Sequence, residues 1–108
     1  MAFSNRVIAV DYLARLEQSM PGLPEWYHFF KLWEESGEVP KAYLQMMGMH
    51  RHGDDVDEDH LLEELADTVI TCYAIALHRH RNLDAAIRRK HTVLMTRAMK
   101  DGGTDGTT

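Results

Sequence analysis

The sequence is poor in the features that mark secreted, membrane-spanning and β-rich proteins. Cys72 is the one cysteine among 108 residues, which excludes a disulfide framework and a zinc site made of several cysteines. No apolar segment of the signal-peptide type opens the chain. The most apolar run, residues 65–77, is shorter than the roughly 20 residues that cross a bilayer, and it contains Asp67. We therefore expect a cytoplasmic protein without a membrane partner, with Cys72 in its core.

Glycine and proline, which interrupt helices, are also confined to few places. Apart from Gly37 and Pro40, they occur in residues 21–24, in residues 48–53 and in a glycine- and threonine-rich tail. The segments between them carry apolar residues at helical spacing and no convincing strand. We predict an all-α protein with one domain at 1–100 and a disordered tail at 101–108. The predicted helices cover about residues 5–19, 24–47, 57–80 and 84–100.

Local chemistry predicts several details of these helices. Pro40 is expected to kink the second helix without breaking it, since proline removes one backbone hydrogen bond. Asp57 or Asp59 is expected to cap the third helix, and Asp84 the fourth, because a carboxylate accepts hydrogen bonds from free N–H groups. Four aromatic residues in the second helix have the spacing of a buried stripe, with a nucleobase pocket as the alternative use for one of them. They are Trp26, Phe29, Phe30 and Trp33.

Charge is unevenly distributed along the chain, although the net charge is −5. Between Glu25 and Asp67 there are twelve acidic and three basic residues, whereas His78 to Lys100 holds seven basic residues and one acidic residue. A net negative charge argues against general binding of nucleic-acid polymers. The asymmetry suits a protein that holds a cation beside an anion, or equally an acidic and a basic helix that pair for stability.

Two pairs of carboxylates stand out in the acidic half, because each pair is spaced three residues apart in a predicted helix. Glu35 and Glu38 are surface neighbours on the second helix, and Glu64 and Asp67 repeat this arrangement on the third. At about 100° per residue, both pairs lie at the edge of an apolar face, while the acidic residue before each pair points further outward. The two helices can therefore present four carboxylates to one another.

Converging carboxylates need a compensating charge. At an effective dielectric of 20, two like charges about 4 Å apart repel by about 4 kcal/mol. Hard oxygen ligands suit Mg²⁺ or Mn²⁺, with water and substrate phosphate in the remaining positions. The alternative is that both pairs face solvent and pair with lysines. On the fourth helix, Lys90 and Arg97 share one face and could bind phosphate or form structural salt bridges.

With these residues, the chain resembles the MazG-like nucleoside triphosphate pyrophosphohydrolases of the all-α NTP pyrophosphatase superfamily. That family carries the pattern EExxE, followed at a distance by ExxD. Here the first motif runs from Glu34 to Glu38 and the second from Glu64 to Asp67, with twenty-five residues between them. A later lysine and arginine seven residues apart also match, so the resemblance covers about residues 7–97.

The resemblance implies a four-helix bundle completed by dimerisation, as a homodimer or a dimer-based tetramer. It implies a Mg²⁺-dependent enzyme, with Mn²⁺ as a substitute, that hydrolyses a (d)NTP or modified nucleotide between the α- and β-phosphates. The products would be a nucleoside monophosphate and pyrophosphate. The implied site residues are Glu34, Glu35 and Glu38 for catalysis, Glu35, Glu38, Glu64 and Asp67 for the metal, and Lys90 and Arg97 for the phosphates.

Three positions depart from the family pattern. Leu94 replaces an asparagine that commonly follows the lysine by four residues, Pro40 follows the first motif, and Arg51 lies in a loop where some relatives have basic residues. These departures keep open a second function, a non-catalytic helical dimer that binds nucleotide or a protein partner through a decayed site.

A di-iron bundle would need two Glu-x-x-His motifs, and residues 25–28 supply one. The seven histidines have no firm metal-binding spacing, so we expect most of them to be solvated or to support the site indirectly.

Overall fold

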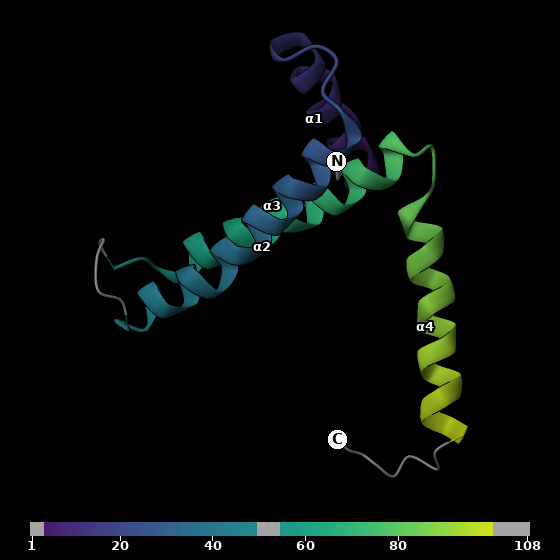
Figure 1. The fold of residues 1–108 in the computed structure, drawn as a ribbon. Coiled ribbons are helices and arrows are strands. Elements are labelled where there is room, and N and C mark those ends of the chain that lie inside the picture. Colours follow the sequence, from purple (N-terminus) through teal and green to yellow (C-terminus); the bar gives the residue numbers. More distant parts are fainter. Residues whose placement is uncertain (1–3, 50–54, 101–108) are drawn as a thin grey trace.

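The regular structure of the chain is α-helical. The computed structural model describes residues 4–49 and 55–100, and no strand occurs in these two segments. Their helices are α1 (Asn5–Ser19), α2 (Glu25–Met46), α3 (Glu58–His78) and α4 (Leu83–Lys100) (Figure 1). The predicted all-α class and the four predicted helices are therefore confirmed. Arg51 and the tail at 101–108, for which we made predictions, lie outside the described residues.

The helices are arranged around α3. Helix α2 runs alongside α3 in the opposite direction, and α1 packs against α3 on another side. Helix α4 contacts α3 near the turn that joins the two helices and then projects away from the other three (Figure 1). The groove between α2 and α3, which side chains of both helices line, is therefore formed within one chain. Most of α4 is not packed along the other helices.

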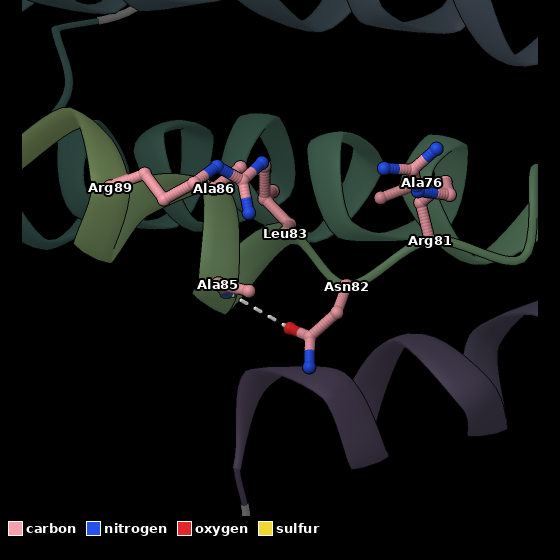
Figure 2. A pocket seen from close by; sticks show the side chains of 7 residues that line it. All are labelled: Ala76, Arg81, Asn82, Leu83, Ala85, Ala86 and Arg89. Carbon is pink, nitrogen blue, oxygen red and sulfur yellow. Dashed lines mark hydrogen bonds between the residues drawn. The ribbon is translucent and has the colours of Figure 1, made fainter.

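Side-chain caps explain where the helices begin. Asp57 accepts a hydrogen bond from the backbone N–H of His60 at 3.0 Å, which confirms one of the two caps predicted for α3. The predicted cap of α4 is wrong, because Asp84 lies inside the first turn. Asn82 takes this role, with its side-chain oxygen 3.1 Å from the backbone nitrogen of Ala85 (Figure 2). The Asp84 carboxylate instead accepts a hydrogen bond from the Tyr73 hydroxyl and ties α4 to α3.

Pro40 does not divide α2. The helix continues as one element from Glu25 to Met46 with Pro40 inside it, so the prediction of an unbroken helix is confirmed. The proline ring removes one backbone hydrogen-bond donor and crowds the preceding turn. The second half of α2 is therefore less stable than it would be with alanine at this position.

The core of one chain is small and made largely of small residues. Ala9, Ala42 and Ala74 are fully or almost fully buried, and Tyr73 is the largest of the buried apolar residues among those described. Cys72, predicted in the core, is half-buried, and burial raises the pKa of its thiol. Each of α1, α2 and α3 buries one of these alanines, and such a small side chain allows packed helices to approach closely.

The predicted burial of the aromatic stripe is wrong for a single chain. The exposed fractions of Trp26 and Trp33 are 66% and 70%, and Phe29 and Phe30 are about half exposed. The spacing does place them on helix α2, but α1 packs on α3 and α4 projects outward, so neither helix covers this surface. The described part of the chain contains no helix with the length and hydropathy needed to cross a membrane.

Candidate metal centre

The four predicted metal ligands face one another across the α2–α3 groove. Glu35 and Glu38 come from α2, and Glu64 and Asp67 come from α3. Together with Lys31 and Glu34, they line a polar pocket of about 290 Å³. Each helix supplies its two carboxylates from adjacent turns of one face, as the spacing of three residues requires.

Three of these carboxylates form a tighter group. One oxygen each from Glu35, Glu64 and Asp67 lies within 4.8 Å of the other two. Glu38 lines the same pocket but stands outside this group, and its carboxylate is 3.9 Å from the Lys41 amine. Exposed acidic residues gather on many proteins without a metal, so the burial of these three decides how unusual the group is.

Two members of the group are largely withdrawn from water. The side chains of Glu35 and Glu64 are 19% and 15% exposed, while Asp67 is exposed at the rim. Burial raises the pKa of the Glu64 carboxyl, and the neighbouring carboxylates raise this pKa further against the opposing effect of His60. His60 reaches Glu64 with an Nε2–Oε1 distance of 3.5 Å. The fold thus keeps the three carboxylates close together although their charges repel one another.

Lys31 is a member of the site that the sequence reasoning missed. Its amine lies 3.4 Å from a Glu35 oxygen and 3.6 Å from a Glu34 oxygen. Burial by itself would lower the pKa of Lys31, but the hydrogen bond to Glu35 and the charges of Glu35 and Glu34 outweigh it and raise that pKa. The spacing of four residues between Lys31 and Glu35 was the available signal.

A second pocket adjoins the acidic one. Its volume is about 240 Å³, and it shares Lys31, Glu35 and Asp67 with the polar pocket. The remainder of its lining is less polar: Ile8 and Tyr12 of α1, and Ile70 and Thr71 of α3. The acidic site is therefore continuous with a region where α1 covers the groove, and a substrate bound to the carboxylates could extend into it.

Lys90 and Arg97 do not reach the acidic pocket of their own chain. Both are exposed residues of α4, which projects away from the α2–α3 groove (Figure 1). At the opposite end of α3, Arg81 and Arg89 line a separate cavity of about 300 Å³ (Figure 2). The structure thus brings the acidic residues together and leaves the predicted phosphate ligands apart from them.

No protein-family model, no curated protein and no solved structure matches this chain. The chemistry of the site must therefore be inferred from its own residues. Three close carboxylates, two of them largely buried, offer oxygen ligands of the kind that Mg²⁺ and Mn²⁺ prefer.

Proposed function

We propose that this chain is a Mg²⁺-dependent nucleoside triphosphate pyrophosphohydrolase. It would hydrolyse a (d)NTP or modified nucleotide between the α- and β-phosphates to a monophosphate and pyrophosphate. The observation that carries the proposal is the group of three carboxylate oxygens, from two helices, that lie within 4.8 Å of one another in a polar pocket. The resemblance of the EExxE and ExxD motifs to the MazG-like enzymes supplies the type of reaction.

The residues fit a hard divalent cation. All donors in the group are oxygens, and the burial of Glu35 and Glu64 makes an uncompensated charge costly. Glu35, Glu64 and Asp67 would hold the ion, and a change of side-chain rotamer would bring Glu38 in from the same pocket. When bound, Mg²⁺ or Mn²⁺ supplies charge neutralisation for phosphate oxygens and lowers the pKa of a coordinated water.

The other residues of the pocket would orient the reaction. Glu34 is near the opening of the pocket and can accept a proton from the water that attacks phosphorus. Lys31 holds the Glu35 carboxylate in place through a contact of 3.4 Å. The attack forms a bond between the water oxygen and phosphorus and breaks the bridging P–O bond, with pyrophosphate or the monophosphate as leaving group.

A second copy of the chain would complete the site. Lys90 and Arg97 belong to an exposed helix, so they can serve a phosphate chain most simply in the site of a partner subunit within a homodimer or a dimer-based tetramer. Exposed apolar side chains on α2 and α4 support such an assembly. They include Trp26, Phe30 and Trp33 on α2 and Ile87, Leu94 and Met95 on α4.

A non-catalytic dimer that binds nucleotide or a protein partner is the second candidate function. The position of Glu38 outside the tight carboxylate group favours it, because a site that had lost activity would tolerate a displaced ligand. Calorimetric titration with a nucleotide and Mg²⁺ separates the two functions. Tight binding without any product would support the second one.

A panel of (d)NTPs incubated with the protein and Mg²⁺, with products followed by ³¹P NMR, tests the enzymatic proposal. We expect a monophosphate and pyrophosphate, and we expect Glu38→Gln to slow their formation strongly. The matched control is Glu63→Gln, which removes an exposed carboxylate next to the site. Diphosphate and inorganic phosphate as products, or equal rates in Glu38→Gln and the parent, would refute the proposal.

A further inference from the structure

His28 of α2 is a buried polar residue without a hydrogen-bonding partner in the described part of the chain. Only 4% of the residue is exposed to solvent. Its neighbours are aromatic rings, with the Tyr27 ring at 5.7 Å and the His78 ring at 5.0 Å between centroids. A buried polar group that lacks a partner carries a cost of about 1–3 kcal/mol, so such residues call for an explanation.

The imidazole of His28 lines a cavity that is separate from both pockets at the acidic site. The cavity has a volume of about 330 Å³ and lies among α1, the link between α1 and α2, and the facing histidines of α2 and α3. Four aliphatic side chains form much of its wall, and the polar side chains Glu17, His28 and His78 complete it. The aliphatic residues are Leu13, Ala14, Leu16 and Leu23.

The charged groups around this cavity already have partners. The Glu17 carboxylate accepts the backbone N–H of Gly22 at 3.2 and 3.3 Å. Glu25 lies beside His78 at 3.7 Å, and both of its oxygens accept hydrogen bonds from Arg79 at 2.8 and 2.9 Å. The described lining of the cavity therefore offers no free cationic group to an anion, and its one carboxylate already has a hydrogen-bond donor, so a neutral molecule suits it better than an ion.

His28 itself is suited to bind a neutral polar group. Burial lowers the pKa of His28, and the adjacent His78 lowers it further against the opposing effect of Glu25, which favours the uncharged ring. A neutral imidazole offers one N–H donor and one nitrogen acceptor. A hydroxyl group can satisfy either atom, while the ring that carries the hydroxyl can pack against the histidine rings and the leucines.

We propose that this cavity binds a small, neutral aromatic alcohol whose hydroxyl group forms a hydrogen bond with His28. The cavity volume is at the lower end of the range of small-molecule sites, which fits a compact ligand. His28 and Glu35 are seven residues apart on α2, about 10 Å along the helix, and the cavity shares none of its described lining residues with the pockets at the acidic site. It would serve as a second ligand site, whatever the acidic pocket does.

Phenol and toluene are matched probes for this proposal, because they have similar shapes and differ in the hydroxyl group. In an apolar cavity without a hydrogen-bonding partner, toluene binds more tightly, since phenol must give up its hydrogen bonds to water. With His28 as partner, we expect phenol to bind the full-length protein at least as tightly as toluene. Phenol should also shift the NMR signals of the His28 ring.

Three variants separate the hydrogen bond from the shape of the cavity. His28→Phe should weaken phenol binding by about tenfold and leave toluene binding unchanged or stronger. His28→Gln keeps a donor and an acceptor and should retain phenol binding. Ala14→Leu, at an exposed position on the rim, should weaken the binding of both probes.

Two results would overturn the proposal. One is tighter binding of toluene than phenol by the parent protein, and the other is the absence of binding of either probe, which would mean that the cavity holds water alone. Both measurements use the parent protein, so they remain decisive even if His28→Phe fails to fold. Hydrolysis of nucleotides is not a readout here, so the outcome is independent of the proposed enzymatic function.

Discussion

Replacement of Glu64 by glutamine probes the electrostatics of the carboxylate group. One oxygen of Glu64 lies within 4.8 Å of oxygens of both Glu35 and Asp67. Two ionised groups at such a separation repel by about 3.5 kcal/mol at an effective dielectric of 20, and by about 1 kcal/mol in bulk water. Asp67 is exposed, and Lys31 offsets part of the charge on the less exposed Glu35, so the lower value is the better guide; two pairs then give on the order of 2 kcal/mol. Without a metal, Glu64→Gln should raise the free energy of unfolding by about this amount.

The pH dependence of this gain has a definite sign. Burial and the neighbouring carboxylates raise the pKa of Glu64 above 4.5, so the folded chain holds this proton more tightly than the unfolded chain does. The free energy of unfolding therefore falls as the pH rises from 4.5 through the raised pKa. Glu64→Gln removes this loss, so the stabilisation should appear at neutral and higher pH and vanish in acid.

Urea denaturation at pH 8, at a fixed protein concentration and with EDTA present, measures the effect. The control Glu63→Gln removes a carboxylate that is 76% exposed and should change the free energy of unfolding by less than about 0.5 kcal/mol. Mg²⁺ at about 100 times its Kd should stabilise the parent by about 2.7 kcal/mol, and Glu64→Gln by less. A Glu64→Gln variant that is less stable than the parent in EDTA would refute the reasoning.

Three other predictions address the dimer and the helices. Trp33→Arg should leave the circular dichroism spectrum unchanged and lower the mass found by sedimentation equilibrium to that of one chain, since Trp33 is exposed in the single chain; an unchanged mass would contradict the proposed interface. Pro40→Ala should raise the free energy of unfolding by about 1–3 kcal/mol because it restores a helix-interior donor, and unaltered stability in urea would count against this. Asn82→Ala should lower the same quantity by about 1 kcal/mol, whereas Asn82→Asp should retain the cap.

The features that the sequence predicted correctly depend on neighbours in the chain. Helix ends follow from glycine, proline and capping side chains, so the limits of α1 and the Asp57 cap could be predicted. The convergence of Glu35, Glu64 and Asp67 follows from helical spacing and from the pairing of two consecutive helices. At the start of α4, residue type alone does not decide between Asn82 and Asp84, because asparagine and aspartate are equally good caps. The conformation of the turn makes Asn82 the cap.

The features that the sequence did not predict depend on how distant segments pack. Periodicity predicts that Trp26 and Trp33 share an apolar face, but it does not say whether another helix of the same chain covers that face. The direction of α4 decides where Lys90 and Arg97 lie, and that direction is set by contacts at the α3–α4 turn. Most histidines were expected to be solvated or to support the site indirectly, but His28 is buried because residues of α1 and α3 lie around it.

The release of pyrophosphate from a cleaved (d)NTP, measured against Mg²⁺ concentration, tests the central claim most directly. Turnover in the parent should rise with Mg²⁺ and stop when EDTA is added. Glu63→Gln should follow the parent, while Glu64→Gln should need far more Mg²⁺ or remain inactive at every concentration. Equal Mg²⁺ dependence in Glu64→Gln and Glu63→Gln, or turnover that persists in EDTA, would contradict a metal centre built on Glu35, Glu64 and Asp67.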